Sequence, residues 1–153
     1  MKLAYRKDHK IEKSDEHYTP KWVFDFLEVT FDLDVASPVE KIDHVPALKR
    51  YTEDSLEKPW EGLIWMNPPY SNATPWINKF IDHGNGIALL HCSKSKWFNR
   101  IWSEADAVVA MPPTFKFERP DGTFRSIAFQ TFLFAKGLEA VEALNKADWA
   151  RVR

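Results

Sequence analysis

The stretch Glu61–Tyr70 constrains the fold more than any other part of the chain. An apolar run from Leu63 to Met66 ends abruptly at Asn67, two prolines and a tyrosine. A short apolar run that stops at such residues is typical of a buried parallel strand, which helices cover on both faces. The sequence therefore predicts an α/β protein whose binding site lies at the carboxyl edge of its sheet, where ligands bind in such folds.

The segment Asn67-Pro68-Pro69-Tyr70 also suggests a particular chemistry. The amide oxygen of Asn67 accepts hydrogen bonds, and the two prolines fix the backbone and remove N–H donors, so that carbonyls such as that of Pro68 can point outward. Two acceptors together suit an exocyclic amine, because accepting both of its hydrogens draws electron density onto the nitrogen. Tyr70 offers a ring face to a planar base or amide. The alternative is a proline-stiffened turn with no chemical role.

Length and composition limit the class of protein. At 153 residues the chain has the size of one domain, and its mostly charged residues 1–16 predict a loose N-terminal arm. No apolar run approaches a membrane span, and the start lacks the apolar core of a signal peptide. We therefore expect a cytoplasmic protein.

The cysteine and histidine content argues against a metal centre. Cys92 is the single cysteine, and the five histidines show no metal-ligand spacing, so no metal is expected. The net charge of −1 gives no overall attraction to nucleic acid. Any binding to DNA would therefore need a local basic surface.

Periodicity and turn residues predict the remaining elements. Thr19 is expected to cap a helix with Pro20 at its first position, and the buried face of this helix is expected to carry Trp22, Val23, Phe26 and Leu27. Residues 39–52 are weakly patterned and predict only a short connection. The other predicted elements are a strand from Phe31, a helix bearing Trp76, Ile77 and Phe80, a strand over 87–92, a helix over 93–105 with Trp97, Ile101 and Trp102 on one face, strands over 107–111 and 127–135, and a helix over 138–146.

Three segments together carry a resemblance to a known family. They are Tyr18-Thr19-Pro20 with the helix after it, Asp32-Leu33-Asp34-Val35-Ala36, and Asn67-Pro68-Pro69-Tyr70-Ser71. In this order they resemble the phage-type DNA N-6-adenine methyltransferases, Dam-like enzymes that use S-adenosylmethionine, over about residues 15–137. The resemblance implies a Rossmann-like class I methyltransferase sheet, abbreviated, with an antiparallel C-terminal hairpin. It also implies a place in the bacterial host cytoplasm if the protein is encoded by a phage. One departure is that Ala36-Ser37-Pro38 replaces the glycine-rich loop usual after the first strand.

The resemblance also implies roles for individual residues. The catalytic residues would be those of the Asn67–Tyr70 segment, namely Asn67, Pro68, Pro69 and Tyr70. S-adenosylmethionine would contact Tyr18, Thr19, Pro20, Asp34 and Asp54, with Thr19 and Pro20 near its methionine part, Asp34 near its amino acid or ribose, and Asp54 near its adenine. The alternatives are a solvated strand edge for Asp34 and a turn cap for Asp54.

DNA recognition is predicted in a hairpin, because the chain has no room for a separate reading domain. Arg119 and Arg125 flank a Pro-Asp-Gly turn, and a two-stranded ribbon fits the major groove of double-stranded DNA. Lys94 and Lys96 are expected to assist. Because this hairpin is small, we expect the protein to recognise a short or relaxed DNA sequence unless a second subunit of a homodimer contributes. The alternatives are a surface hairpin that closes the sheet and a solvated charged face.

The predicted function is methylation of adenine N6 in DNA. A methyltransferase acting on RNA or on a protein glutamine is an alternative, since both substrates are served by Asn-Pro-Pro-Tyr sites. A non-catalytic DNA-binding module with a methyltransferase fold is another. The missing glycine loop favours that module, whereas the intact Asn67–Tyr70 segment argues against it, because a scaffold has no use for paired acceptors beside an aromatic ring.

Overall fold

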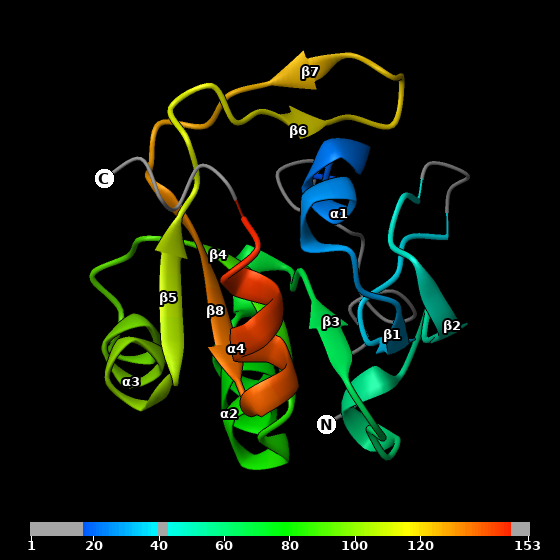
Figure 1. Cartoon of the computed structure of the whole chain (residues 1–153), viewed down its shortest axis with the longest axis vertical. Helices are drawn as coiled ribbons and strands as arrows, with labels where there is room; N and C mark the ends of the chain where they lie inside the picture. The colour runs from blue at the N-terminus through cyan, green and yellow to red at the C-terminus, as the bar shows by residue number, and fades with distance from the viewer. Residues whose placement is uncertain (1–16, 40–42, 148–153) are drawn as a thin grey trace.

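The computed structural model describes residues 17–39 and 43–147, which are built around one six-stranded sheet (Figure 1). In chain order its strands are β1 (Phe31–Asp34), β2 (Ala47–Arg50), β3 (Ile64–Met66), β4 (Gly86–His91), β5 (Ala107–Ala110) and β8 (Thr131–Lys136). The spatial order is β2-β1-β3-β4-β8-β5. Strands β2, β1, β3 and β4 are parallel, and β8 is antiparallel to both β4 and β5. The carboxyl ends of β1, β2, β3 and β4 therefore meet at one edge of the sheet, which we call the carboxyl edge.

Helices cover both faces of the sheet. They are α1 (Lys21–Leu27), α2 (Thr74–His83), α3 (Lys96–Glu104) and α4 (Leu138–Leu144), with short 3-10 turns η2 (Ser55–Glu57) and η3 (Tyr70–Asn72). Residues of α2 and α3 pack into one hydrophobic core with one face of the sheet, and residues of α1 and α4 pack into a second core with the other face. In Figure 1, α4 lies in front of the sheet and α2 behind it. The architecture is thus a three-layer α/β/α arrangement.

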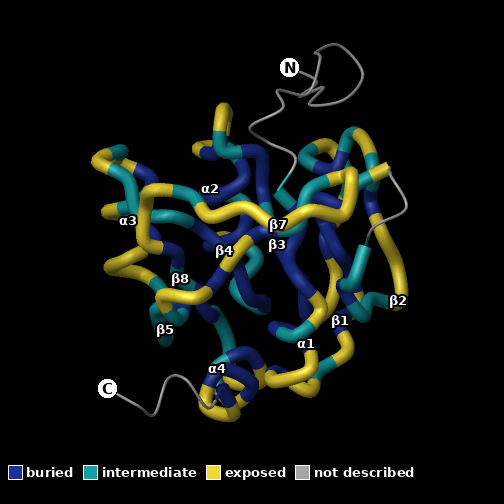
Figure 2. Tube along the Cα trace, turned by 90° about the horizontal axis from the view of Figure 1, so that it is seen from above, coloured by how far each residue is buried: buried dark blue, intermediate teal, exposed yellow. Residues whose placement is uncertain are grey.

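Strands β6 (Phe117–Glu118) and β7 (Phe124–Arg125) form a separate antiparallel hairpin. It lies across the carboxyl edge in Figure 1, and Figure 2 shows β7 from above as a largely exposed segment over β3. Phe117 is fully buried and packs edge-on against Phe115 at 4.8 Å between ring centroids. The predicted hairpin is confirmed, and its base is anchored in the core beside α1.

Local sequence signals account for the elements that position the carboxyl edge. In α2 the buried residues Trp76, Ile77, Phe80 and Ile81 fall on one face at helical spacing, as predicted. Gly84 ends this helix with a positive φ of 76°, which glycine adopts without the clash a Cβ would cause. The predicted strand before the Asn-Pro-Pro-Tyr segment is β3, all three residues of which are buried.

Two predictions about α1 are wrong. Thr19 does not cap α1, because Pro20 is the N-cap residue and no side chain bonds there. The buried residues of α1 are Val23, Phe24 and Leu27, whereas Phe26 is 37% exposed. On α3 the predicted face is confirmed, because Trp97 and Ile101 are buried and Trp102, although 51% exposed, packs edge-on against Phe132 and Phe134 of β8.

The predictions for two strands are also corrected. Residues 39–52 hold more than a short connection, because they include β2, which pairs in parallel with β1. As an edge strand, β2 has mostly exposed side chains and so carries no hydrophobic signal. The last strand begins at Thr131 rather than at Ile127, and Phe129 before it is exposed. The predicted arm over residues 1–16 lies outside the described residues.

Candidate active site

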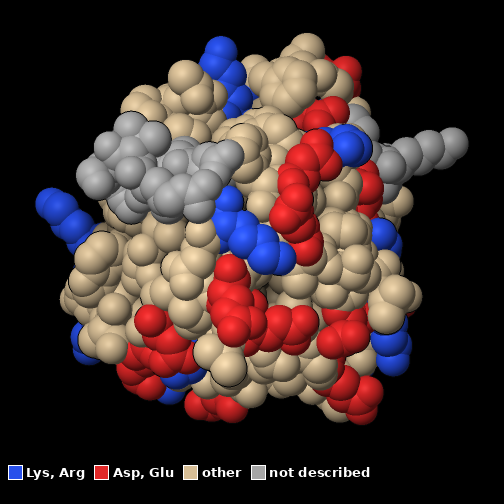
Figure 3. Space-filling view, in the orientation of Figure 1, with Lys and Arg blue, Asp and Glu red and all other residues tan. Residues whose placement is uncertain are grey.

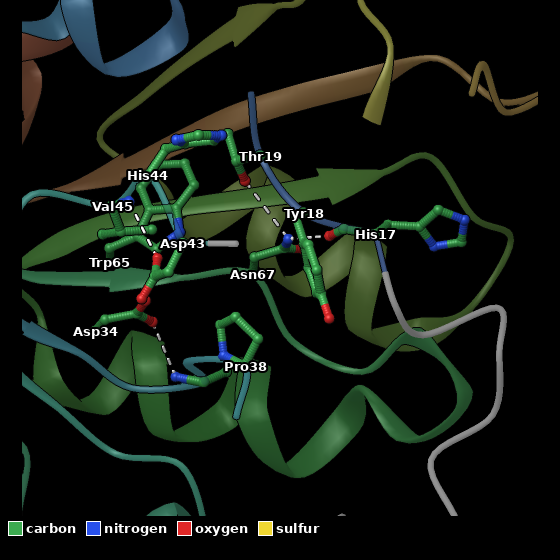
Figure 4. A pocket seen from close by; sticks show the side chains of 11 residues that line it. His17, Tyr18, Thr19, Asp34, Pro38, Asp43, His44, Val45, Trp65 and Asn67 are labelled. Carbon is green, nitrogen blue, oxygen red and sulfur yellow. Dashed lines mark hydrogen bonds between the residues drawn. The ribbon is translucent and has the colours of Figure 1, made fainter. Parts of the chain in front are cut away.

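A cleft, which we call the main cleft, opens where the carboxyl ends of β1 and β3 meet the segment before α1 (Figure 4). Four stretches of the chain line it, and their lining residues are His17, Tyr18, Thr19, Asp34, Ala36, Pro38, Asp43, His44, Val45, Trp65 and Asn67. Parallel strands β1 and β3 are direct neighbours, so the residues that end them or follow them face the same space.

The side chain of Asn67 is held in one orientation. Its Nδ2 atom donates a hydrogen bond to the His17 carbonyl at 2.7 Å and lies 3.5 Å from the hydroxyl oxygen of Thr19. Because a carbonyl oxygen can only accept, the amide nitrogen must face His17 and the amide oxygen must point the other way. The segment before α1 therefore fixes the direction of the acceptor that the sequence singled out.

Tyr70 contacts the same amide and is itself held by β4. Its hydroxyl donates to the Leu89 carbonyl at 2.9 Å and lies 3.3 Å from Oδ1 of Asn67. Its ring packs edge-on against His91, with 4.3 Å between centroids. The ring of His91 stacks in turn on exposed Phe129 at 5.5 Å. The end of β3 is thus joined to an aromatic row at the ends of β4 and β8.

Pro68 and Pro69 are buried and carry the chain from β3 into η3. The Pro69 carbonyl accepts a hydrogen bond from the Asn72 amide at 3.2 Å, which closes the turn. Fixed φ angles at both prolines limit the freedom of this turn. The prolines therefore restrict the backbone positions of Asn67 and Tyr70.

Asp34 is a buried carboxyl group at the base of the main cleft, only 1% exposed. Its Oδ1 atom accepts a hydrogen bond from the Ala36 amide at 3.1 Å, and the Arg50 guanidinium lies 3.9 Å from Oδ2. Burial raises the pKa of Asp34 to about 8, and the negative charge of Asp43 adds to the rise, while the Ala36 amide and Arg50 act in the opposite direction. Asp34 is therefore largely protonated at neutral pH, and a cation brought beside it would favour its ionised form.

Asp43 organises the wall next to Asp34. Its carboxylate accepts hydrogen bonds from the Ser37 hydroxyl at 2.9 Å, from the Val45 amide at 3.1 Å and from Arg50 at 2.6 Å. These contacts tie the chain after β1 to the chain before β2. They support the backbone of the segment that stands in place of a glycine-rich loop.

A second, smaller hollow adjoins the main cleft, and Ala36 lines both. Its lining residues are Val35, Ala36, Tyr51, Thr52, Glu53, Asp54, Ser55 and Trp76. Asp54 precedes η2 with a positive φ of 55°, and the Glu57 amide bonds its carbonyl at 3.0 Å. On the far side of this loop, the ammonium of Lys79 donates to two carbonyls of residues 56–58. The hollow thus has a braced wall that carries an acidic residue.

The predicted site residues fall into three groups. Tyr18, Thr19, Asp34 and Asn67 come together in the main cleft, and Asp54 lies in the adjoining hollow. Pro20, Pro68, Pro69 and Tyr70 are supporting neighbours outside the lining residues of the main cleft. Lys94 and Lys96 are exposed after β4, while Arg119 and Arg125 lie at the two sides of the hairpin turn.

Sequence reasoning missed Asp43, His44 and Trp65 in the main cleft. Trp65 lies in a strand whose residues are all apolar, so the sequence predicted its burial. The sequence did not show that Trp65 also lines a cleft. Asp43 and His44 lie in a segment with no periodic pattern. The one available signal was the presence of polar residues just before an edge strand.

The family model of the DNA N-6-adenine-methyltransferases (Dam) matches residues 7–123 of the chain. The chain belongs to this family. The matched span contains the four parallel strands, β1 to β4, and ends inside the hairpin, before β7.

The chain is also similar to the DNA N-6-adenine-methyltransferase of Haemophilus phage HP1 (strain HP1c1). The two are 31% identical over 114 residues, which cover 64% of this chain and 64% of the phage protein. The comparison therefore spans somewhat less than two thirds of that relative. No solved structure matches the chain significantly.

Two further structural findings concern the described residues only. None of their helices is long and apolar enough to cross a membrane. Within residues 17–39 and 43–147, no three His, Cys, Asp or Glu side chains are grouped so that they could hold a metal ion.

Proposed function

We propose that the chain transfers the methyl group of S-adenosylmethionine to N6 of adenine in double-stranded DNA. The observation that carries the proposal is the fixed amide of Asn67, whose oxygen is turned away from His17 at the end of β3 beside a two-part cleft. Membership of the Dam family and the name of the phage relative support the same reaction.

The proposal includes a class I methyltransferase sheet, Rossmann-like and abbreviated, in a single domain. The strand order and the antiparallel insertion of β8 between β4 and β5 support it. The abbreviation would lie between β1 and β2, where the described residues of the connection contain no helix.

The residues present fit a cofactor of this shape and charge. The main cleft and the adjoining hollow meet at Ala36 and together extend from Asn67 to Asp54 along the carboxyl edge. Asp34 would pair with the amino group of the methionine part, near Tyr18, Thr19 and Pro20, because a buried carboxyl gains most from a nearby cation. Asp54 in the hollow would bind the adenosine part through its carboxylate.

The bound cofactor would supply an electrophilic methyl group on a sulfonium centre. Asn67, with the Pro68 carbonyl, would accept the hydrogens of the exocyclic amine and hold its lone pair toward that methyl group. The nitrogen would form the new bond to carbon as the carbon–sulfur bond breaks, and the surplus proton would pass to water. Tyr70 would stack on the flipped base, and its hydroxyl bond to Leu89 would keep the ring in place.

DNA would be bound along the carboxyl edge. The hairpin there exposes Arg125 and Phe124, the latter 58% exposed, while Arg119 is partly exposed at the start of the turn. Lys94 and Lys96 follow the carboxyl end of β4 and are exposed as well. On the face shown in Figure 3, Asp and Glu gather over the lower half and Lys and Arg are scattered, so the proposal assigns no DNA contact to that half.

One experiment tests the function. The protein is incubated with tritiated S-adenosylmethionine and, in separate reactions, with unmethylated double-stranded DNA, with RNA or with a protein substrate, and the DNA nucleosides are analysed for N6-methyladenine. Asn67→Ala should lower turnover by about two orders of magnitude or more while S-adenosylhomocysteine binding is kept. Asn72→Ala, an exposed asparagine in η3, is the matched control and should retain full turnover.

Three outcomes would contradict the proposal. Label in RNA or protein but not in DNA would favour the alternative substrates. Binding of DNA without any transfer would favour a non-catalytic module. Near-wild-type turnover of Asn67→Ala would remove the role assigned to its amide.

A further inference from the structure

Glu118 in β6 joins the hairpin to the main cleft through both its backbone and its side chain. Its amide donates to the Tyr18 carbonyl at 2.8 Å, and the Tyr18 amide donates to the Glu118 carbonyl at 2.8 Å. Its carboxylate oxygen Oε1 lies 2.8 Å from Nε2 of His44. Since a carboxylate only accepts, Nε2 of His44 is the donor in this contact. Tyr18 and His44 come from two different lining segments of the cleft (Figure 4).

The contact between Glu118 and His44 is largely shielded from water. The Glu118 side chain is 13% exposed and that of His44 is 30% exposed. The neighbouring Phe117 is fully buried and its ring lies 5.2 Å from that of His17. A contact that is shielded in this way holds its geometry better than an exposed pair does.

His44 belongs to a wall that is braced from two sides. On one side Asp43 binds Ser37 and Arg50, which tie the wall to β1 and β2. On the other side His44 contacts Glu118 of β6. A shift of the hairpin would therefore move His44 and Tyr18, and a ligand in the main cleft would resist that shift.

We propose that Glu118 is a positioning residue that holds the His44 wall of the cofactor cleft against the hairpin, so that cofactor and DNA strengthen each other's binding. This inference rests on the proposed function, which assigns the cleft to the cofactor and the hairpin to DNA. Glu118 touches neither ligand in this scheme. It acts through His44 and Tyr18, and the coupling must be reciprocal by thermodynamic linkage.

The test is a double-mutant cycle with Glu118→Ala, His44→Ala and the double variant. Calorimetry measures the Kd of S-adenosylhomocysteine with and without a DNA duplex, and the Kd of the duplex with and without S-adenosylhomocysteine. In the wild type each ligand should tighten the other by about 5-fold or more. Each single variant should lose most of this factor, and the double variant should lose no more than either one.

Two controls separate coupling from damage to the fold. Glu57→Ala removes an exposed glutamate in η2 and should leave the coupling unchanged. His44→Gln keeps an N–H donor for the carboxylate and should restore much of the coupling that His44→Ala loses. Glu118→Gln, which keeps the shape of the side chain and one acceptor oxygen, replaces Glu118→Ala if that variant does not fold, and it should weaken the coupling.

The outcomes are distinguishable. If the wild type binds both ligands and Glu118→Ala keeps the full coupling, or if the wild type shows none, the inference is wrong and the proposed function stands. If losses in Glu118→Ala and His44→Ala add up in the double variant, the two side chains act independently and the inference is also wrong. If the wild type binds neither ligand, the proposed function fails and the inference fails with it.

Discussion

Asp34→Asn should stabilise the folded protein, and the gain should grow as the pH rises. The wild-type carboxyl is buried, and its pKa is raised from 3.8 to about 8 by burial and by Asp43. Between these values the unfolded chain has released the proton and the folded chain still holds it. The contribution of protonated Asp34 to the free energy of unfolding is therefore fully present below about pH 3.8, and it is lost as the pH rises toward 8. An asparagine keeps the oxygen that accepts from Ala36 but has no proton to hold.

The magnitude follows from the size of the pKa shift. Each pH unit inside the window changes the free energy of unfolding by about 1.4 kcal/mol for a single group. From pH 5 to pH 7 the wild type should therefore lose up to about 3 kcal/mol through Asp34, and the variant should lose none of it. The difference between the two proteins should widen by that amount over these two units.

Urea denaturation at pH 5, 6 and 7 measures the effect for both proteins. Glu142→Gln on the exposed face of α4 is the control, since it also removes one carboxylate but not a buried one. Its free energy of unfolding should track that of the wild type. A gap between Asp34→Asn and the wild type that stays constant from pH 5 to pH 7, or that narrows, would refute the role given to burial.

Four further predictions concern the cofactor, the core, the tyrosine and the hairpin. If the ionised form of Asp34 binds the amino group of the cofactor, S-adenosylhomocysteine affinity should rise by up to about tenfold from pH 6 to pH 7, and calorimetry on Asp34→Asn should show no such rise. Gly86→Ala should lower the free energy of unfolding, measured by urea denaturation, by more than about 2 kcal/mol, because the new Cβ would lie 2.5 Å from the Ile64 carbonyl oxygen in the neighbouring strand. A decrease of less than about 0.5 kcal/mol, which is typical of a surface substitution, would argue against this close approach. Tyr70→Phe should lower the free energy of unfolding by about 1 kcal/mol, because it removes the hydrogen bond to the Leu89 carbonyl. It should also slow methyl transfer without weakening the binding of S-adenosylhomocysteine. Weaker binding would instead place Tyr70 in the cofactor cleft. Arg119→Ala combined with Arg125→Ala should weaken duplex binding and lower the salt slope by about one for each phosphate that the protein no longer neutralises. Lys49→Ala combined with Lys146→Ala removes the same charge from exposed positions outside the hairpin and is the control, and an unchanged salt slope and site pattern in the folded arginine variant would move recognition elsewhere.

The sequence alone determined the elements whose signals are local. A run of apolar residues ended by Asn67 and two prolines predicted β3 and its turn, and helical spacing from Trp76 to Phe80 predicted α2. The sequence also indicated that Asp34 and Asn67 lie at one edge of the sheet, because Asp34 ends one parallel strand and Asn67 follows another. These predictions needed only side-chain periodicity and backbone chemistry, which neighbours in the chain supply.

Only the tertiary structure decided which other residues complete the site. The contact between His44 and Glu118 joins residues 74 positions apart, and neither segment has a pattern that points to the other. The raised pKa of Asp34 depends on its burial and on the nearness of Asp43, which follow from packing. Strand β2 is an edge strand whose backbone pairs with β1 while its side chains stay mostly exposed. Burial, electrostatic fields and strand pairing are made by groups that meet only when the chain has folded, so the sequence carries no local trace of them.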